Sequence, residues 1–130
     1  MKTFRNPTTI HQPLASYTHQ IEIQGAQRWL VLSGQIGMDK YGELPSDPIE
    51  QFKLALTNIY HNLEAANMEI GDLVKLSIYL VGDIDSELRR EVLSNWLYGH
   101  KPSMTLLYVA ALASSEIKVE LEALACADHE

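Results

Sequence analysis

The segment from Met104 to Ala111 is apolar at nearly every position, and this constrains the fold more than any other feature of the sequence. As a β-strand, it would carry Met104, Leu106, Tyr108 and Ala110 on one face and Thr105, Leu107, Val109 and Ala111 on the other. A strand that is apolar on both faces needs cover on both faces. The segment therefore predicts a sheet that packs against other structure on each side.

A long amphipathic helix is predicted from Pro48 to Ala66, because apolar residues recur there at spacings of three and four from Ile49 onward. Asp47 suits the N-cap position, and proline suits the first helical position. A helix with one apolar stripe can cover one face of the predicted sheet.

A second, shorter helix is predicted after Asp85, which also suits an N-cap. Its apolar side is expected to consist of Leu88, Val92 and Trp96. The pair Arg89–Arg90 is expected on the opposite side, which faces solvent.

Alternating apolar positions predict five strands, at residues 17–23, 28–36, 73–81, 100–112 and 116–125. The sequence QGAQR between the first two is short enough to connect them as a hairpin. Together with the helices, the predicted order is ββαβαββ. This order indicates an α+β fold in which a mixed sheet has both helices on one face.

The second face of this sheet is predicted to be covered by other copies of the chain. It would carry the polar residues Lys75, Ser77, Tyr79, Glu120 and Glu122 beside the apolar strand described above. The 130 residues form a single predicted domain, 1–130, and no segment remains to cover that face. We therefore expect a homo-oligomer that packs through the sheet, with pockets at the edges of the interface.

Composition disfavours several classes of protein. Ten Lys and Arg residues against 17 Asp and Glu give a net charge of −7, which disfavours binding to nucleic acid through phosphates. No apolar run is long enough for a membrane span, and the first residues lack the apolar core of an export signal, so we expect a cytoplasmic protein. The five histidines lack metal-ligand spacing, so no metal and no cofactor are predicted.

Four segments together resemble one known family. They are PLASYTHQI, VLSGQIGMDKYGELPSD, GDLVKLSIYLV and VELEALA, within a likeness that runs from Asn6 to Ala125. The sequence is identified as a member of the RidA family, also called YjgF, endoribonuclease L-PSP or reactive-intermediate deaminase. This resemblance implies a chorismate-mutase-like α+β fold and a barrel-like homotrimer with small-molecule pockets between subunits.

The resemblance also implies an activity and a site. Members of the family hydrolyse enamines and imines, including 2-iminobutanoate and 2-iminopropanoate, to carbonyl compounds and ammonia. The positions that match the family's pocket are Tyr17, Ser33, Met104, Thr105, Leu106 and Glu120. Glu120 is the expected catalytic carboxylate, and the other five are expected to bind substrate. The family's carboxylate-binding arginine falls on Met104, which has neither charge nor donor, so an altered substrate is expected.

Three functions remain open from the sequence. The first is a deaminase that acts on an imine without a carboxylate, or that uses Lys101, His100 or Arg28 as a substitute cation. The second is a non-catalytic trimer that binds a small molecule or another protein. The third is a ribonuclease or translation inhibitor, which the acidic charge disfavours.

Overall fold

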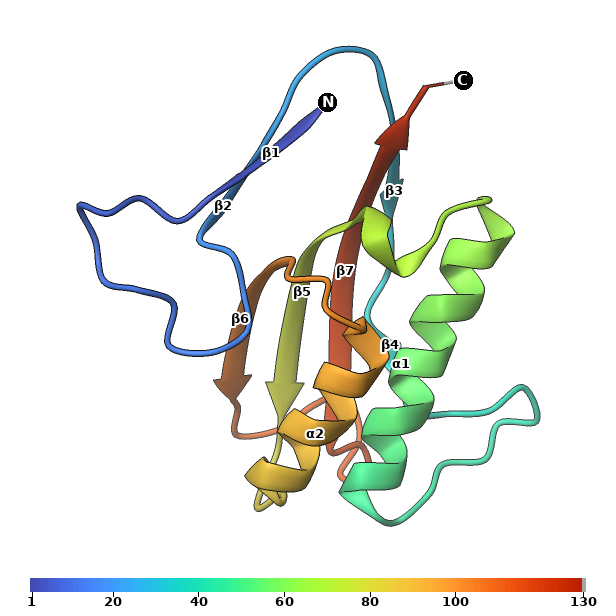
Figure 1. Ribbon diagram of the computed structural model, residues 1–130. Coiled ribbons are helices and arrows are strands. Elements are labelled where there is room, and N and C mark those ends of the chain that lie inside the picture. Colours follow the sequence, from blue (N-terminus) through green and yellow to red (C-terminus); the bar gives the residue numbers. More distant parts are fainter. Residues whose placement is uncertain (130) are drawn as a thin grey trace.

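The computed structural model describes residues 1–129 and contains one sheet of five strands, a separate pair of strands and two α-helices. The elements in chain order are β1 (Lys2–Arg5), β2 (Gln20–Ile23), β3 (Gln27–Val31), β4 (Gln35–Ile36), α1 (Pro48–Ala65), the 3-10 turn η1 (Ile70–Asp72), β5 (Leu73–Leu80), α2 (Ser86–Leu97), β6 (Ser103–Tyr108) and β7 (Val119–Asp128). Figure 1 shows both helices on the same side of the sheet. The predicted α+β architecture is therefore confirmed.

The five-stranded sheet is mixed. Its strands lie in the order β3, β7, β5 and β6, and the short β4 also pairs with β7. β5 and β6 are parallel and α2 connects them, whereas β7 runs antiparallel to β3, β4 and β5. This arrangement makes β6 an edge strand that lies beside α2.

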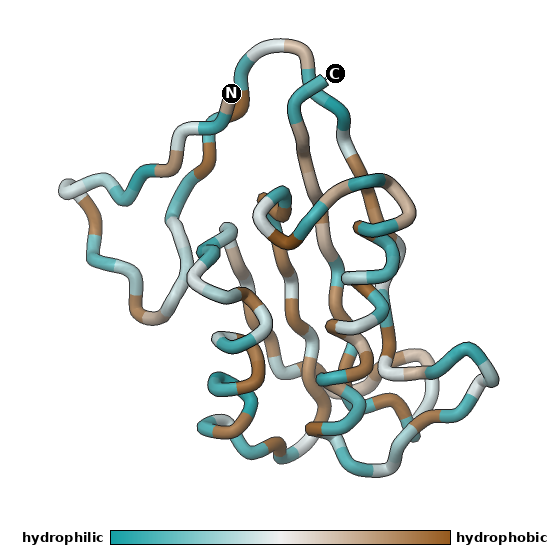
Figure 2. Tube along the Cα trace, turned by 45° about the vertical axis from the view of Figure 1, so that its right-hand side comes forward, coloured by the Kyte–Doolittle hydropathy of each residue, from teal (hydrophilic) through white to brown (hydrophobic). Residues whose placement is uncertain are grey.

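The hydrophobic core fills the space between the helices and the sheet. In Figure 2 hydrophobic positions recur along both helices and along the strands that they cover. The largest fully buried side chains include Phe52, Leu56, Ile59 and Leu63 of α1, and Leu76, Ile78 and Leu80 of β5. Transfer of such side chains from water is the main favourable term in folding.

The first helix lies where its periodicity predicts. α1 begins at Pro48 and ends at Ala65, and the Asp47 carboxylate accepts a hydrogen bond from the Ile49 amide at 3.0 Å. The alternation in β5 and β7 is confirmed as well, because Leu76, Ile78 and Leu121 are buried while their sequence neighbours are not.

The predicted hairpin between the first two strands is wrong. β2 pairs instead with β1, with Lys2 opposite Ile23, and β3 pairs with β7. The chain turns away between them at Gly25, whose φ of +87° a glycine adopts without strain. Alternation shows that a segment is extended, but it does not show which segment it pairs with.

The strand predicted at residues 28–36 is interrupted. It forms β3 and β4, separated by Leu32–Gly34. A Cβ on Gly34 would lie 1.9 Å from Oε2 of Glu120, so the carboxylate of Glu120 occupies the space beside the interruption. The break in the strand therefore brings the Gly34 backbone against that side chain.

The apolar side of the second helix is partly as predicted, because Val92 and Trp96 pack against the core. Its buried residues are Arg89, Leu93 and Leu97, whereas Leu88 is exposed. Arg89, expected on the solvent side, is only 7% exposed. The prediction therefore fails at two neighbouring positions, where Leu88 is exposed and Arg89 is buried.

Candidate functional site

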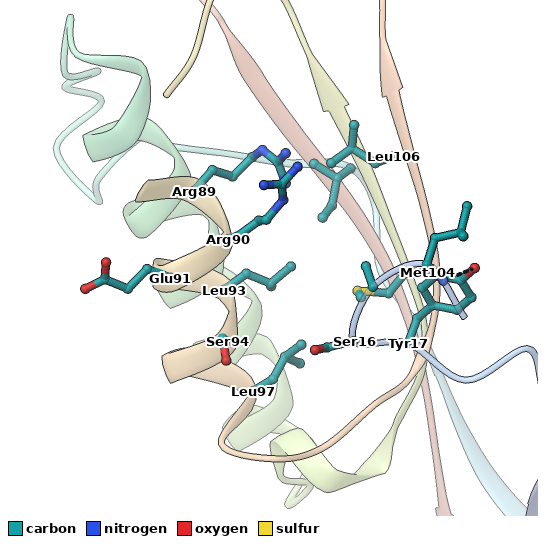
Figure 3. Close-up of a pocket in the computed structure, with 13 residues that line it drawn as sticks. Ser16, Tyr17, Arg89, Arg90, Glu91, Leu93, Ser94, Leu97, Met104 and Leu106 are labelled. Carbon is teal, nitrogen blue, oxygen red and sulfur yellow. Dashed lines mark hydrogen bonds between the residues drawn. The ribbon is translucent and has the colours of Figure 1, made fainter. Parts of the chain in front are cut away.

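A cleft of about 870 Å³ lies between α2 and the edge strand β6. Met104 and Leu106 of β6 form one wall, and α2 forms the opposite wall (Figure 3). The floor includes Ile78 of β5, and residues 14–17 cover the outer edge. A volume of this order suits a small organic ligand.

The wall on β6 follows from strand geometry. Pro102 is buried just before the strand, and the parallel pairing with β5 places Met104 opposite Leu76 and Leu106 opposite Ile78. Successive side chains of a strand alternate between faces, so Met104 and Leu106 face α2 while Thr105 faces away. Of the three residues predicted on this strand, Met104 and Leu106 line the cleft and Thr105 does not.

The segment around Tyr17 is held against the start of β6. The Thr18 hydroxyl donates a hydrogen bond to the Lys101 carbonyl oxygen at 2.6 Å, and the Thr18 amide donates to the Pro102 carbonyl oxygen at 3.3 Å. The phenolic oxygen of Tyr17 accepts a hydrogen bond from the Leu14 amide at 3.1 Å. Its own hydroxyl proton therefore remains available to donate to another group.

Arg89 is the charged group that most distinguishes the cleft, and the sequence prediction placed it in solvent. It extends from α2 toward β6, as does the exposed Arg90, whereas Glu91 points away (Figure 3). The Nε atom of Arg89 is buried without a hydrogen-bond partner. One sequence signal could have located it, because Arg89, Leu93 and Leu97 share one helical stripe at spacings of four.

None of the three proposed substitute cations lines this cleft. The Arg28 guanidinium donates to the carbonyl oxygen of Ala66 at 3.0 Å, at the end of α1. The His100 ring is bonded to the Leu73 carbonyl oxygen at 2.8 Å, and Lys101 is exposed. Within one chain, Arg89 and Arg90 are the cationic residues that line the cleft.

The remaining predicted site residues lie on the open face of the sheet. Glu120 faces that side from β7, next to the Ser33–Gly34 break, and the Thr105 hydroxyl there accepts a hydrogen bond from Lys75 Nζ at 2.8 Å. Glu120 has no ion-pair partner within residues 1–129. One chain thus brings Tyr17, Met104 and Leu106 together, and holds Ser33, Thr105 and Glu120 on the other side of the sheet.

A second carboxylate on the open face has a different role. Glu122 accepts a hydrogen bond from the Tyr79 hydroxyl at 2.5 Å. This bond raises the pKa of Tyr79, because it favours the protonated phenol beside a negative charge. Lys75 on the same face bonds to Thr105 and to neither carboxylate.

Two further observations concern metal ligands and membrane spans in the described residues. Within residues 1–129, no three His, Cys, Asp or Glu side chains converge to form a metal site. No helix of the described chain is both long enough and apolar enough to cross a bilayer.

Comparison with known proteins decides the family. The family model described as Endoribonuclease L-PSP matches residues 9–127. This chain belongs to the RidA/YjgF family. It is 30% identical over 114 residues to the 2-iminobutanoate/2-iminopropanoate deaminase of Mus musculus. The aligned region covers 86% of this chain and 82% of the mouse protein.

Solved RidA/YjgF structures share the fold. The Rid family protein YyfB of Yersinia pestis matches with a TM-score of 0.84 and 27% identity over 97% of this chain and 98% of its own. The structure of Escherichia coli TdcF with bound serine matches with a TM-score of 0.69 and 26% identity over 85% and 92% of the two chains. The RidA-type fold predicted from the sequence is therefore confirmed.

Proposed function

We propose that this RidA/YjgF protein hydrolyses reactive enamines and imines to a carbonyl compound and ammonia. The observation that carries the proposal is its likeness, over 86% of the chain, to a mouse protein named as a 2-iminobutanoate/2-iminopropanoate deaminase. The TdcF structure with bound serine adds that a relative binds an amino acid. The cleft between α2 and β6 has the size for such a ligand.

The reaction needs few catalytic groups. Water adds to the carbon of the C=N bond to form a carbinolamine, the nitrogen takes up a proton, and ammonia leaves as the C=O bond forms. An imine is already electrophilic, so a bound water and a group that transfers protons are sufficient. We assign proton transfer to Glu120, whose carboxylate lies beside the Gly34 backbone.

The separation of the site residues supports a shared site. Glu120 and Ser33 lie on the opposite face of the sheet from Met104 and Leu106, so one chain does not assemble the set. The open face also exposes Val31 (73%), Trp29 (54%) and Leu107 (48%). We propose a homotrimer in which the open face of one subunit completes the cleft of its neighbour.

A complementation experiment tests both parts. Glu120→Gln should lower turnover by about 10²-fold, the usual scale for a group that transfers protons. Met104→Glu should block the cleft of its own subunit. Co-expression of these two inactive chains should restore activity, because each mixed trimer has one cleft with an intact Met104 next to an intact Glu120.

The measurement uses a 2-imino acid that an amino-acid oxidase generates in the cuvette, with semicarbazide to capture the imine that remains. Light scattering on each sample reports its oligomeric state. No restoration in verified mixed trimers would contradict the shared site. No acceleration by the wild-type protein over the uncatalysed reaction would contradict the deaminase assignment.

A second candidate function is supported by Met104. Methionine cannot clamp a carboxylate, so a trimer that binds a small molecule without transforming it also fits the apolar wall on β6. Ligand binding without turnover in the same assays would favour this alternative.

A further inference from the structure

We propose that Arg89 of α2 forms a carboxylate-binding subsite in the cleft, and that the ligand joins this carboxylate to an aliphatic tail. This inference deepens the proposed function, on which the identity of the ligand as a 2-imino acid rests. The subsite itself depends only on the cleft, so it can be tested by binding alone.

The first argument is the state of the guanidinium. Arg89 is 7% exposed and its buried Nε atom has no hydrogen-bond partner. Its side chain is in none of the ion pairs or side-chain hydrogen bonds formed within residues 1–129. Arginine stays charged in proteins, and its buried Nε–H donor without a partner costs free energy. An anionic ligand would remove this penalty.

The second argument is the direction of the side chain. Asp85 caps α2 at its start, and Arg89 follows one turn later on the stripe that Leu93 and Leu97 continue. Figure 3 shows Arg89 and Arg90 directed toward the cleft and Glu91 directed away from it. The charged groups that line the cleft thus present positive charge to its interior.

The third argument is the chemistry of the other walls. The aliphatic residues that line the cleft are Leu14, Ile78, Leu93, Leu97, Met104 and Leu106. A guanidinium binds a carboxylate through two parallel hydrogen bonds, and aliphatic walls favour an apolar group beside it. The cleft therefore suits a 2-imino acid with a side chain of about the size of leucine.

This arrangement explains how an uncharged residue, Met104, can stand where the family's carboxylate-binding arginine falls. The cation lies on α2 across the cleft from β6, and the Met104 side chain is free to contact the apolar tail of the ligand. Met104→Arg would add a second positive charge and remove apolar surface. It should shift preference from long aliphatic ligands toward short ones.

The test measures binding of three stable compounds by calorimetry. They are 4-methyl-2-oxopentanoate, pyruvate, and 4-methyl-2-pentanone, which keeps the tail but lacks the carboxylate. Wild-type protein should bind 4-methyl-2-oxopentanoate about tenfold or more tightly than either of the others, as a charge-assisted pair and an apolar tail each allow.

Arg89→Met should remove the advantage of the carboxylate and leave the ketone unaffected. Lys101→Met is the matched control, because Lys101 is exposed and does not line the cleft. Arg89→Lys keeps the charge without the planar fork and should bind with intermediate affinity. The melting temperature of Arg89→Met should be unchanged or higher, because the variant removes a buried donor that has no hydrogen-bond partner.

The possible results distinguish the proposed carboxylate subsite from the proposed deaminase reaction. Carboxylate binding that depends on Arg89, without turnover of any imine, would sustain the subsite and overturn the deaminase proposal. Turnover with equal carboxylate affinity in wild type and Arg89→Met would sustain the deaminase and overturn the subsite. A lower melting temperature with dissociation of the oligomer in Arg89→Met would show that the arginine pairs across an interface, and would also overturn the subsite.

Discussion

Each of the two helices buries one long polar side chain, and the two side chains differ in their hydrogen bonds. Gln51 of α1 is completely buried, and its amide group donates to the carbonyl oxygens of Pro45 at 2.8 Å and Glu116 at 3.0 Å. Its Oε1 atom accepts from the Lys118 amide at 2.8 Å. Arg89 of α2 is almost as deeply buried, yet its Nε has no partner.

This difference separates a structural polar group from a functional one. Gln51 joins the start of α1 to the loop before β7, so its burial is compensated by hydrogen bonds to backbone groups. The Arg89 Nε lacks a compensating hydrogen bond and the residue lines a cleft, which supports the ligand subsite that we propose. The same substitution at both positions should therefore have opposite effects on stability.

The largest expected effect on stability comes from Gln51→Met. Methionine has a similar length but makes no hydrogen bonds, so three partly buried backbone groups would lose their partner. We expect the free energy of unfolding to fall by about 3 kcal/mol, since each unsatisfied buried group costs roughly 1 kcal/mol or more. Urea denaturation measures it, with Arg89→Met as the comparison. A similar loss in both variants would remove the distinction between the two residues.

A smaller effect is expected from Gly34→Ala, which tests a third polar group, Glu120. The added Cβ would lie 1.9 Å from Oε2 of Glu120, so the flexible carboxylate must move. We expect a loss of about 1 to 2 kcal/mol in stability from overpacking. In the background Glu120→Ala the same glycine substitution should be nearly neutral, and a double-mutant cycle measures the difference. An unchanged loss in that background would show that Glu120 does not occupy the space.

The smallest expected effect concerns Tyr79, a polar group on the open face that has a partner. The hydrogen bond to Glu122 raises the pKa of Tyr79 above 10.0, so the folded state favours the protonated phenol. This contribution to stability is complete below the unfolded pKa and is lost as pH rises through the folded pKa. Tyr79→Phe should lower the urea midpoint slightly at pH 8, with a smaller difference at pH 11. A difference that grows with pH would contradict the sign.

Much of the fold could be predicted because its signals are local. The stripe from Ile49 to Leu63 and the caps at Asp47 and Asp85 depend on neighbours within one helical turn, and all lie where predicted. The alternation in β5 is equally local. The partner of β2 depends instead on contacts with β1, about 20 residues away in the chain, and no local pattern contains that information.

The candidate site was predictable in part for the same reason. Resemblance and alternation together located the wall of Met104 and Leu106 and the tyrosine at its edge. They did not show that Ser33 and Glu120 lie across the sheet from that wall. The face on which a side chain lies, relative to residues of other strands, depends on how the strands pair.

The sequence by itself determined the elements of this protein, the apolar character of β6 and the absence of a cation at Met104, because residue type and periodicity depend on the chain alone. Only the tertiary structure decided that Leu88 of α2 is exposed and that Arg89 is buried. Leu88, Val92 and Trp96 form one stripe and Arg89, Leu93 and Leu97 form its neighbour, and the two differ by a rotation of about 100° about the helix axis. The second stripe is buried, Val92 and Trp96 of the first are partly buried against the core, and Arg89 consequently lines the cleft.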